Sequence, residues 1–101
     1  MNKKIYISGP ITDTNDDYKA RFKKYEDSIN KISGYEAINP AYTTLSASAE
    51  HKDYMHVSFA LIDLADAIMM TKGWESSEGC KQELQYAATR GINIFFEEHA
   101  K

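Results

Sequence analysis

Short apolar runs alternate with longer segments of helical periodicity along the whole chain of 101 residues. The runs are rich in β-branched and aromatic residues, which is typical of strands, and they cover residues 4–8, 35–38, 67–70 and 92–96. The segments between them run from a cap near Thr14, Asn15 or Asp16 to about Ser33, from about 51 to 65, and from 77 to 90. Strands that alternate with helices form right-handed crossovers and a parallel sheet covered on both faces. The sequence therefore predicts one flavodoxin-like α/β domain over residues 1–101, with four to five strands in the order 2-1-3-4.

Each predicted helix carries an apolar face that should pack on this sheet. Apolar residues that recur every three or four positions share one side of a helix. The three faces are, in chain order, Tyr18, Phe22, Tyr25, Ile29 and Ile32; then Tyr54, Val57, Leu61 and Leu64; then Cys80, Leu84, Ala87 and Ala88.

The predicted topology also gives the position of a ligand site. Open parallel sheets bind ligands beyond the carboxyl ends of the strands, where the strand order reverses. Here that point lies between the first and third strands, at the loops 8–13 and 71–77. The second loop brings serines and a glycine to a helix N-terminus, where unpaired N–H groups attract anions.

Glu83 is the candidate reactive group of this site. It follows Gly79 by four residues, so both lie on one helix face. Gly79 has no side chain, which would let a ligand approach the backbone in front of the carboxylate. The alternative interpretation is a solvated helix charge, since charged residues are mostly exposed.

Composition excludes several classes of function. The net charge of −3 gives no basic patch, which disfavours nucleic-acid binding. No apolar run is long enough to span a bilayer. Cys80 is the single cysteine, so there is no internal disulfide, and a reducing cytoplasm fits. His51, His56 and His99 lack ligand-like spacing, so we expect neither a metal site nor a cofactor.

Several motifs follow one another along nearly the whole chain: IYISGPIT at 5–12, INPA at 38–41, DAI at 66–68, GWESSEG at 73–79, and then Glu83 and Ala87. In their order and spacing they resemble the nucleoside 2-deoxyribosyltransferase-like superfamily. Its short, often phage-encoded branch of the DUF4406 type is the most similar. The resemblance implies the same fold and cleavage of the N-glycosidic bond of a (deoxy)nucleoside or nucleoside 5′-monophosphate.

The resemblance also implies roles for individual residues. Glu83 would be the nucleophile that forms a glycosyl-enzyme ester. The substrate-binding residues would be Tyr6, Ser8, Gly9, Ile11, Thr12, Ser58, Asp66, Trp74, Ser77 and Gly79. Trp74 could stack on a base or simply pack on the domain, and Tyr6 could belong to the core or to the cleft.

Ser58 departs from the family pattern, which has an aspartate eight residues before the position of Asp66. A serine cannot act as an acid near neutral pH, so two hypotheses stay open. The chain is either an N-glycosidase or deoxyribosyltransferase, or a module of the same fold that binds a nucleotide without turnover; a purely structural role fits the polar loops less well. We also expect a homodimer or higher homo-oligomer, because the isologous dimer is the commonest closed assembly.

Overall fold

The computed structural model describes residues 2–11, 15–43 and 45–97. Four strands, β1 (Lys3–Ser8), β2 (Tyr35–Ile38), β3 (Ala67–Met70) and β4 (Asn93–Phe96), form one parallel sheet in the order β2-β1-β3-β4. Three helices, α1 (Tyr18–Asn30), α2 (His51–Asp63) and α3 (Glu78–Thr89), connect them, with short 3-10 turns at Pro40–Tyr42 and Trp74–Ser76. The predicted α/β class and strand order are confirmed.

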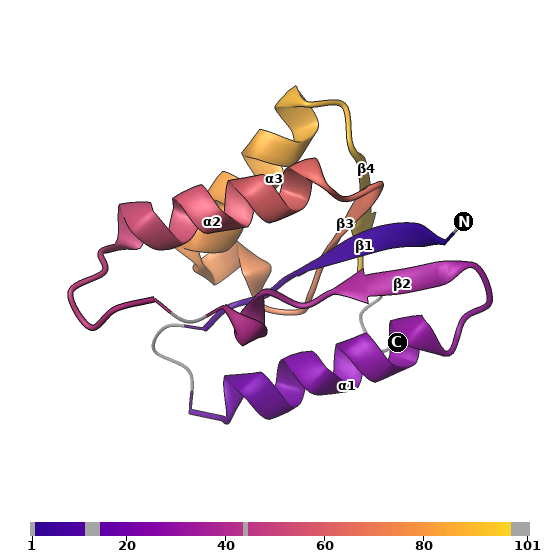
Figure 1. Ribbon diagram of the computed structural model, residues 1–101, viewed down its shortest axis with the longest axis horizontal. Helices are drawn as coiled ribbons and strands as arrows, with labels where there is room; N and C mark the ends of the chain where they lie inside the picture. The colour runs from indigo at the N-terminus through magenta and orange to yellow at the C-terminus, as the bar shows by residue number, and fades with distance from the viewer. Residues whose placement is uncertain (1, 12–14, 44, 98–101) are drawn as a thin grey trace.

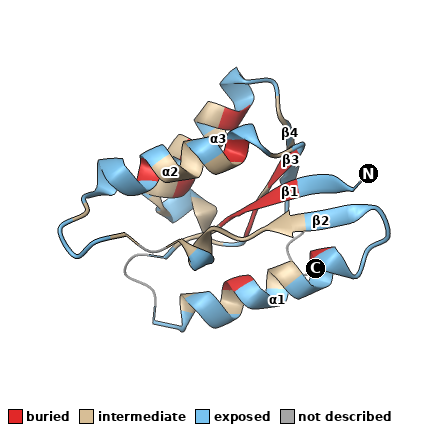
Figure 2. Cartoon of the chain, viewed as in Figure 1, coloured by how far each residue is buried: buried red, intermediate tan, exposed pale blue. Residues whose placement is uncertain are grey.

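The helices cover the two faces of the sheet unequally (Figure 1). Helix α1 lies against one face, and α2 and α3 lie side by side against the other. Buried residues are concentrated in the central strands β1 and β3, whereas the residues of β2 are exposed or intermediate (Figure 2). The switch point between β1 and β3 therefore lies in the best-packed part of the domain.

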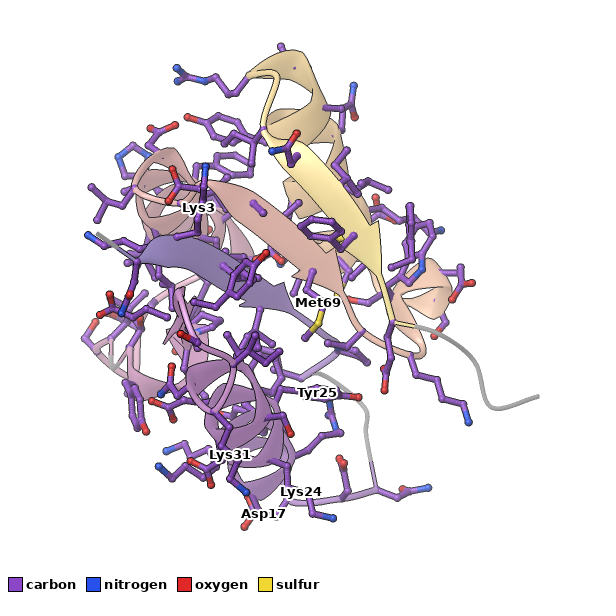
Figure 3. All side chains as sticks on the ribbon, turned by 90° about the vertical axis from the view of Figure 1, so that its right-hand side faces the viewer. Lys3, Asp17, Lys24, Tyr25, Lys31 and Met69 are labelled. Carbon is purple, nitrogen blue, oxygen red and sulfur yellow. The ribbon has the colours of Figure 1, made fainter. Side chains whose placement is uncertain are left out.

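Alternation along β1 divides the core into two layers, because successive strand side chains point to opposite faces. Ile5 and Ile7 pack with Phe22 and Ile29 of α1. Tyr6 faces the other way and packs against α2 and α3. Tyr25 and Met69 lie in the α1 layer, whereas Lys24 and Lys31 point outward (Figure 3).

Helix α1 differs from its predicted bounds at both ends. Its cap is Asp17, whose carboxylate accepts hydrogen bonds from two backbone N–H groups, rather than Asn15 or Asp16; Thr14 lies outside the described residues. The helix ends at Asn30, before the predicted Ser33, because the Asn30 side chain accepts from the N–H of Ala37 and the chain turns at Gly34 into β2. Gly34 has φ +89°, a left-handed conformation that favours glycine.

Four residues of the predicted apolar faces are exposed, which corrects those predictions: Ile32, Tyr54, Leu64 and Ala88. Leu64 follows the last turn of α2, and the buried residues of that helix are Met55 and Ile62. Ile32 lies beyond the end of α1, and Ala88 lies on the outer side of α3. Within the described ranges, no helix is long and apolar enough to cross a membrane.

Candidate functional site

The carboxylate of Glu83 lies at the carboxyl end of β1, held by two hydroxyl groups. The same alternation that turns Tyr6 toward α3 turns Ser8 there too. The Tyr6 hydroxyl donates to Oε2 at 2.8 Å, and Ser8 Oγ donates to Oε1 at 2.6 Å. Both donors come from a strand that is 75 or more residues away in sequence. Each carboxylate oxygen thus has its own donor, which fixes the orientation of the group.

Glu83 is buried, with 8% of its surface exposed, so the interpretation as a solvated helix charge is wrong. It shares the inward face of α3 with Cys80 and Ala87. Burial raises the pKa of Glu83 above its usual value, and hydrogen bonds from Ser8, Tyr6 and Ser58 work against that rise, as does the charge of His51. Burial also raises the pKa of Tyr6 well above 10, and the nearby Glu83 carboxylate adds to the rise, so Tyr6 donates its hydrogen as a neutral phenol.

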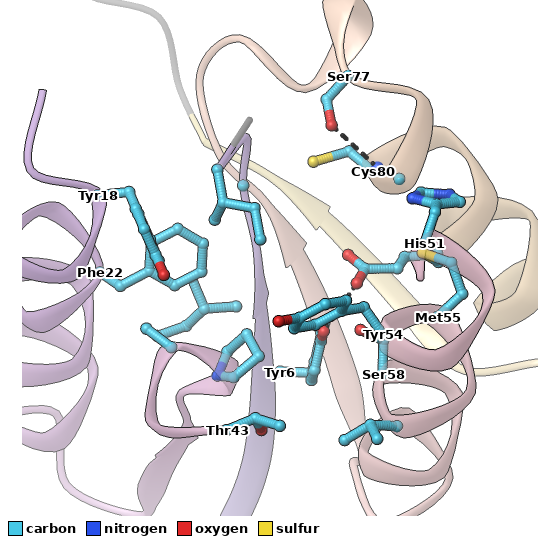
Figure 4. A pocket seen from close by; sticks show the side chains of 18 residues that line it. Tyr6, Tyr18, Phe22, Thr43, His51, Tyr54, Met55, Ser58, Ser77 and Cys80 are labelled. Atoms are coloured by element: carbon cyan, nitrogen blue, oxygen red, sulfur yellow. Dashed lines mark hydrogen bonds between the residues drawn. The ribbon is translucent and has the colours of Figure 1, made fainter. Parts of the chain in front are cut away.

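A cavity of about 480 Å³ opens in front of this carboxylate (Figure 4). That volume falls within the range of small-molecule sites. The cavity is bounded by the end of β1, α1, the segment after β2, α2 and the start of α3. The lining residues are Tyr6, Ile7, Gly9, Ile11, Tyr18, Phe22, Pro40, Ala41, Thr43, His51, Tyr54, Met55, Val57, Ser58, Ser77, Gly79, Cys80 and Glu83.

Two glycines line the cavity in different surroundings. A Cβ atom on Gly9 would lie 2.5 Å from Thr71 Oγ1, so only glycine permits this close passage of the chain. Thr71 is fully buried, and its hydroxyl donates to the carbonyl oxygen of Ser8. A Cβ atom on Gly79 would meet Met55 and His51 at ordinary contact distances. A small side chain would therefore fit at position 79, and glycine there relieves no clash.

Among the described residues, no three His, Cys, Asp or Glu side chains come together as a metal site would require. The chemically active groups around the cavity are a buried carboxylate, several hydroxyls, one thiol and one imidazole. This set suits nucleophilic and acid–base chemistry on a small ligand.

Comparison with known proteins places the chain in a family. The family described as "Domain of unknown function (DUF4406)" matches residues 3–96, nearly the whole sequence. This chain is a DUF4406 protein. No curated protein matches its sequence.

Two solved structures share the fold of this DUF4406 chain. One is a conserved protein from Enterococcus faecalis V583, with 20% identity, a TM-score of 0.72 and coverage of 95% of this chain. The other is a 2-desoxiribosyltransferase from Leishmania mexicana, with 22% identity, a TM-score of 0.70 and coverage of 93%. The match covers 63% of each of those longer chains. The resemblance to the nucleoside 2-deoxyribosyltransferase-like superfamily is confirmed at the level of the fold.

The structure brings most of the predicted site residues of this DUF4406 chain together. Residues from distant parts of the chain meet around the cavity: Tyr6, Gly9, Ile11, Ser58, Ser77, Gly79 and Glu83. Ser8 lies behind them and contacts the Glu83 carboxylate. Ser77 caps α3, where its hydroxyl accepts from the N–H of Cys80 at 3.2 Å.

Two predicted residues that the structure describes, Asp66 and Trp74, are not brought to the cavity. The carboxylate of Asp66 accepts from the N–H of Lys4 at the amino end of the sheet, opposite to the site. Trp74 packs against the core and the ring of Phe96, with ring centres 5.6 Å apart, as its alternative interpretation proposed. Thr12 lies outside the described residues.

Sequence reasoning missed several residues that line the cavity. His51, Tyr54 and Met55 come from the first turns of α2, and Thr43 comes from the segment after β2. Tyr54 and Ser58 are four residues apart on α2, so they share a face. That spacing from a predicted site residue was the one signal that could have identified Tyr54.

We expect Glu83→Gln to increase stability at neutral pH but not in acid. A carboxyl group whose pKa is higher in the folded chain binds its proton more tightly there than in the unfolded chain. Its contribution to the free energy of unfolding is therefore full below the ordinary pKa of the carboxyl group, and it declines as the pH rises through the raised pKa. Glutamine does not titrate and avoids that decline. The measurement is urea unfolding of the wild type and of Glu83→Gln at about pH 4 and about pH 7.5, two values that bracket the ordinary glutamate pKa. An equal difference in unfolding free energy at the two pH values would contradict the expectation.

Proposed function

We propose that the cavity binds a (deoxy)nucleoside or nucleoside 5′-monophosphate and that Glu83 cleaves its N-glycosidic bond. One observation carries the proposal: a buried carboxylate faces a cavity of suitable size while Tyr6 and Ser8 hold both of its oxygens. A similar fold occurs in a 2-desoxiribosyltransferase. Without a reactive role, burial of a glutamate in a cavity wall would only cost stability.

The proposed reaction has two steps. A Glu83 oxygen attacks the anomeric carbon, the carbon–nitrogen bond breaks, and its electron pair leaves with the base. The resulting ester between Glu83 and the sugar is then resolved by water or by a second base, which gives hydrolysis or transfer. The adjacent negative charge stabilises the oxocarbenium-like transition state.

Several neighbours would bind the substrate in this scheme. Gly9, Ile11 and Gly79 line the cavity that would hold the substrate, and Ser77 with the N-terminus of α3 provides a polar end for an anionic group. Ser58 lines the cavity together with Glu83, and its hydroxyl works against the rise in the pKa of that carboxyl group. The predicted homo-oligomer remains part of this proposal.

A second candidate function is nucleotide binding without turnover. It is favoured by Ser58, which lines the cavity where the family pattern has an aspartate. A panel of nucleosides and 5′-monophosphates distinguishes the two functions. Free base detected by mass spectrometry supports the enzyme, whereas a thermal shift with no release supports the binding protein. If no compound of the panel gives either free base or a thermal shift, both candidate functions are overturned.

We expect Ser58→Asp to raise base release by about 10²-fold, the lower end of what a general acid contributes. Two carboxyl groups in close contact do not ionise equally, so one pKa rises and that group stays protonated at neutral pH. The protonated group could then serve the leaving base while Glu83 attacks. The measurement is the initial rate with the best nucleotide of the panel.

Ser28→Asp is the matched control for this variant, because Ser28 is exposed on α1 and lies away from the cavity. Its rate should equal that of the wild type. An unchanged or lower rate for Ser58→Asp, with the protein still folded, would mean that the missing carboxylate does not limit turnover.

A further inference from the structure

The proposed reaction requires a proton for the leaving base, and position 58 cannot supply it. A base that departs with the glycosidic electron pair carries negative charge unless a donor protonates it. The Ser58 hydroxyl is too weak an acid near neutral pH. If the proposed function holds, another group in the cavity must serve as the donor.

The chemistry of the lining leaves one suitable group. Among the described lining residues, the ionisable side chains are Tyr6, Tyr18, His51, Tyr54, Cys80 and Glu83. Phenols and thiols ordinarily titrate well above neutral pH, and burial raises the pKa of both Tyr6 and Cys80 further. Glu83 is the nucleophile. The imidazole of His51 is the remaining group, and imidazole is the side chain that exchanges protons near neutral pH.

The position of His51 suits this role. It opens α2 and lines the cavity beside the start of α3 (Figure 4). Its Cε1 atom would lie 3.7 Å from a Cβ atom on Gly79, so the ring edge lies next to the first turn of α3. Its charge reaches Glu83, where it lowers the pKa of the carboxyl group.

One hydrogen bond holds the ring. Nε2 of His51 and Oε1 of Gln82 on α3 lie 3.2 Å apart. A carbonyl oxygen only accepts, so Nε2 carries the hydrogen of this bond. The other ring nitrogen, Nδ1, takes no part in the bond, and in the imidazolium form it carries a proton that can be transferred.

We propose that His51 is the acid–base residue of this site. The inference rests on the proposed function. As the bond between the anomeric carbon and the base breaks, the electron pair goes to the base, and the Nδ1 proton moves to a ring nitrogen of that base. His51 is then neutral. When water attacks the sugar ester of Glu83, its proton returns to His51, its oxygen joins the anomeric carbon, and the Glu83 carboxylate is released.

A leaving group that needs no proton provides the test. The substrates are the four common 2′-deoxynucleoside 5′-monophosphates and 4-nitrophenyl 2-deoxyribose 5-phosphate, because nitrophenolate departs as an anion. His51→Gln should slow base release from the nucleotides by about 10²- to 10⁴-fold, the range of general acid catalysis. It should change nitrophenolate release less than about threefold, since that step gains little from an acid. Glu83→Gln should abolish both.

Matched controls separate the possible outcomes. His56 is exposed on the same helix and does not line the cavity, so His56→Gln should leave both rates unchanged. Equal slowing of both substrates by His51→Gln would overturn the proton-donor role, and so would an unchanged nucleotide rate. A wild-type protein that releases neither base nor nitrophenolate would overturn the proposed function and this inference with it.

Discussion

Glu83→Gln should remove base release almost completely while the protein stays folded. Loss of a covalent nucleophile costs several orders of magnitude, roughly 10⁴- to 10⁶-fold in well-studied enzymes, because the amide cannot form the ester. The substitution keeps the volume of the side chain, and the amide can still accept one hydrogen bond from Tyr6 or Ser8. Mass spectrometry of released base, beside a circular dichroism spectrum, measures both parts of the expectation.

Glu78→Gln is the matched control, since Glu78 is exposed in the first turn of the same helix and does not line the cavity. Its rate should stay at the wild-type level. If the protein only binds nucleotides, Glu83→Gln should instead change affinity by about 1.5–3 kcal/mol, as for a hydrogen bond to a charged group. Unchanged activity and affinity with every ligand would show that the carboxylate has no functional role.

Phe22→Ala should cost about 3–5 kcal/mol of unfolding free energy, the range for truncation of a buried phenylalanine. Phe22 is 1% exposed and packs against Ile5, Ile7 and Ile29 in the layer between α1 and the sheet. Its ring also lies where a Cβ atom on Gly9 would approach at 3.2 Å, so it supports the chain where β1 ends. The substitution therefore removes core contacts and also weakens the support of the chain where β1 ends at the cavity.

Urea unfolding followed by circular dichroism measures this loss. A domain of this size has only about 5–15 kcal/mol in total, so Phe22→Ala could be too unstable to measure. Phe22→Leu, which retains more volume, then provides a smaller loss in the same direction. Lys24→Ala is the control, because Lys24 is exposed on α1 and should change stability by less than about 0.5 kcal/mol. A loss for Phe22→Ala no larger than that of the control would contradict its role in the core.

The sequence alone determined the class of fold and the end of the sheet at which the candidate site lies. Strand and helix periodicities are local properties, and parallel crossovers allow few topologies, so the order β2-β1-β3-β4 followed from the pattern. The same reasoning placed Gly79 and Glu83 near the switch point. Errors occurred at helix ends such as Asn30 and Leu64, where caps and turns rather than periodicity decide.

Only the tertiary structure decided which individual side chains are buried and which residues they contact. Glu83 is buried because Tyr6 and Ser8, from a strand far away in sequence, cover its carboxylate, and helix spacing carries no information on such contacts. Asp66 and Trp74 follow the motif pattern, yet the former lies at the opposite end of β3 and the latter packs against Phe96. His51 joins the site because α2 packs beside α3. Burial and proximity depend on how elements pack on each other, which periodicity along one chain does not specify.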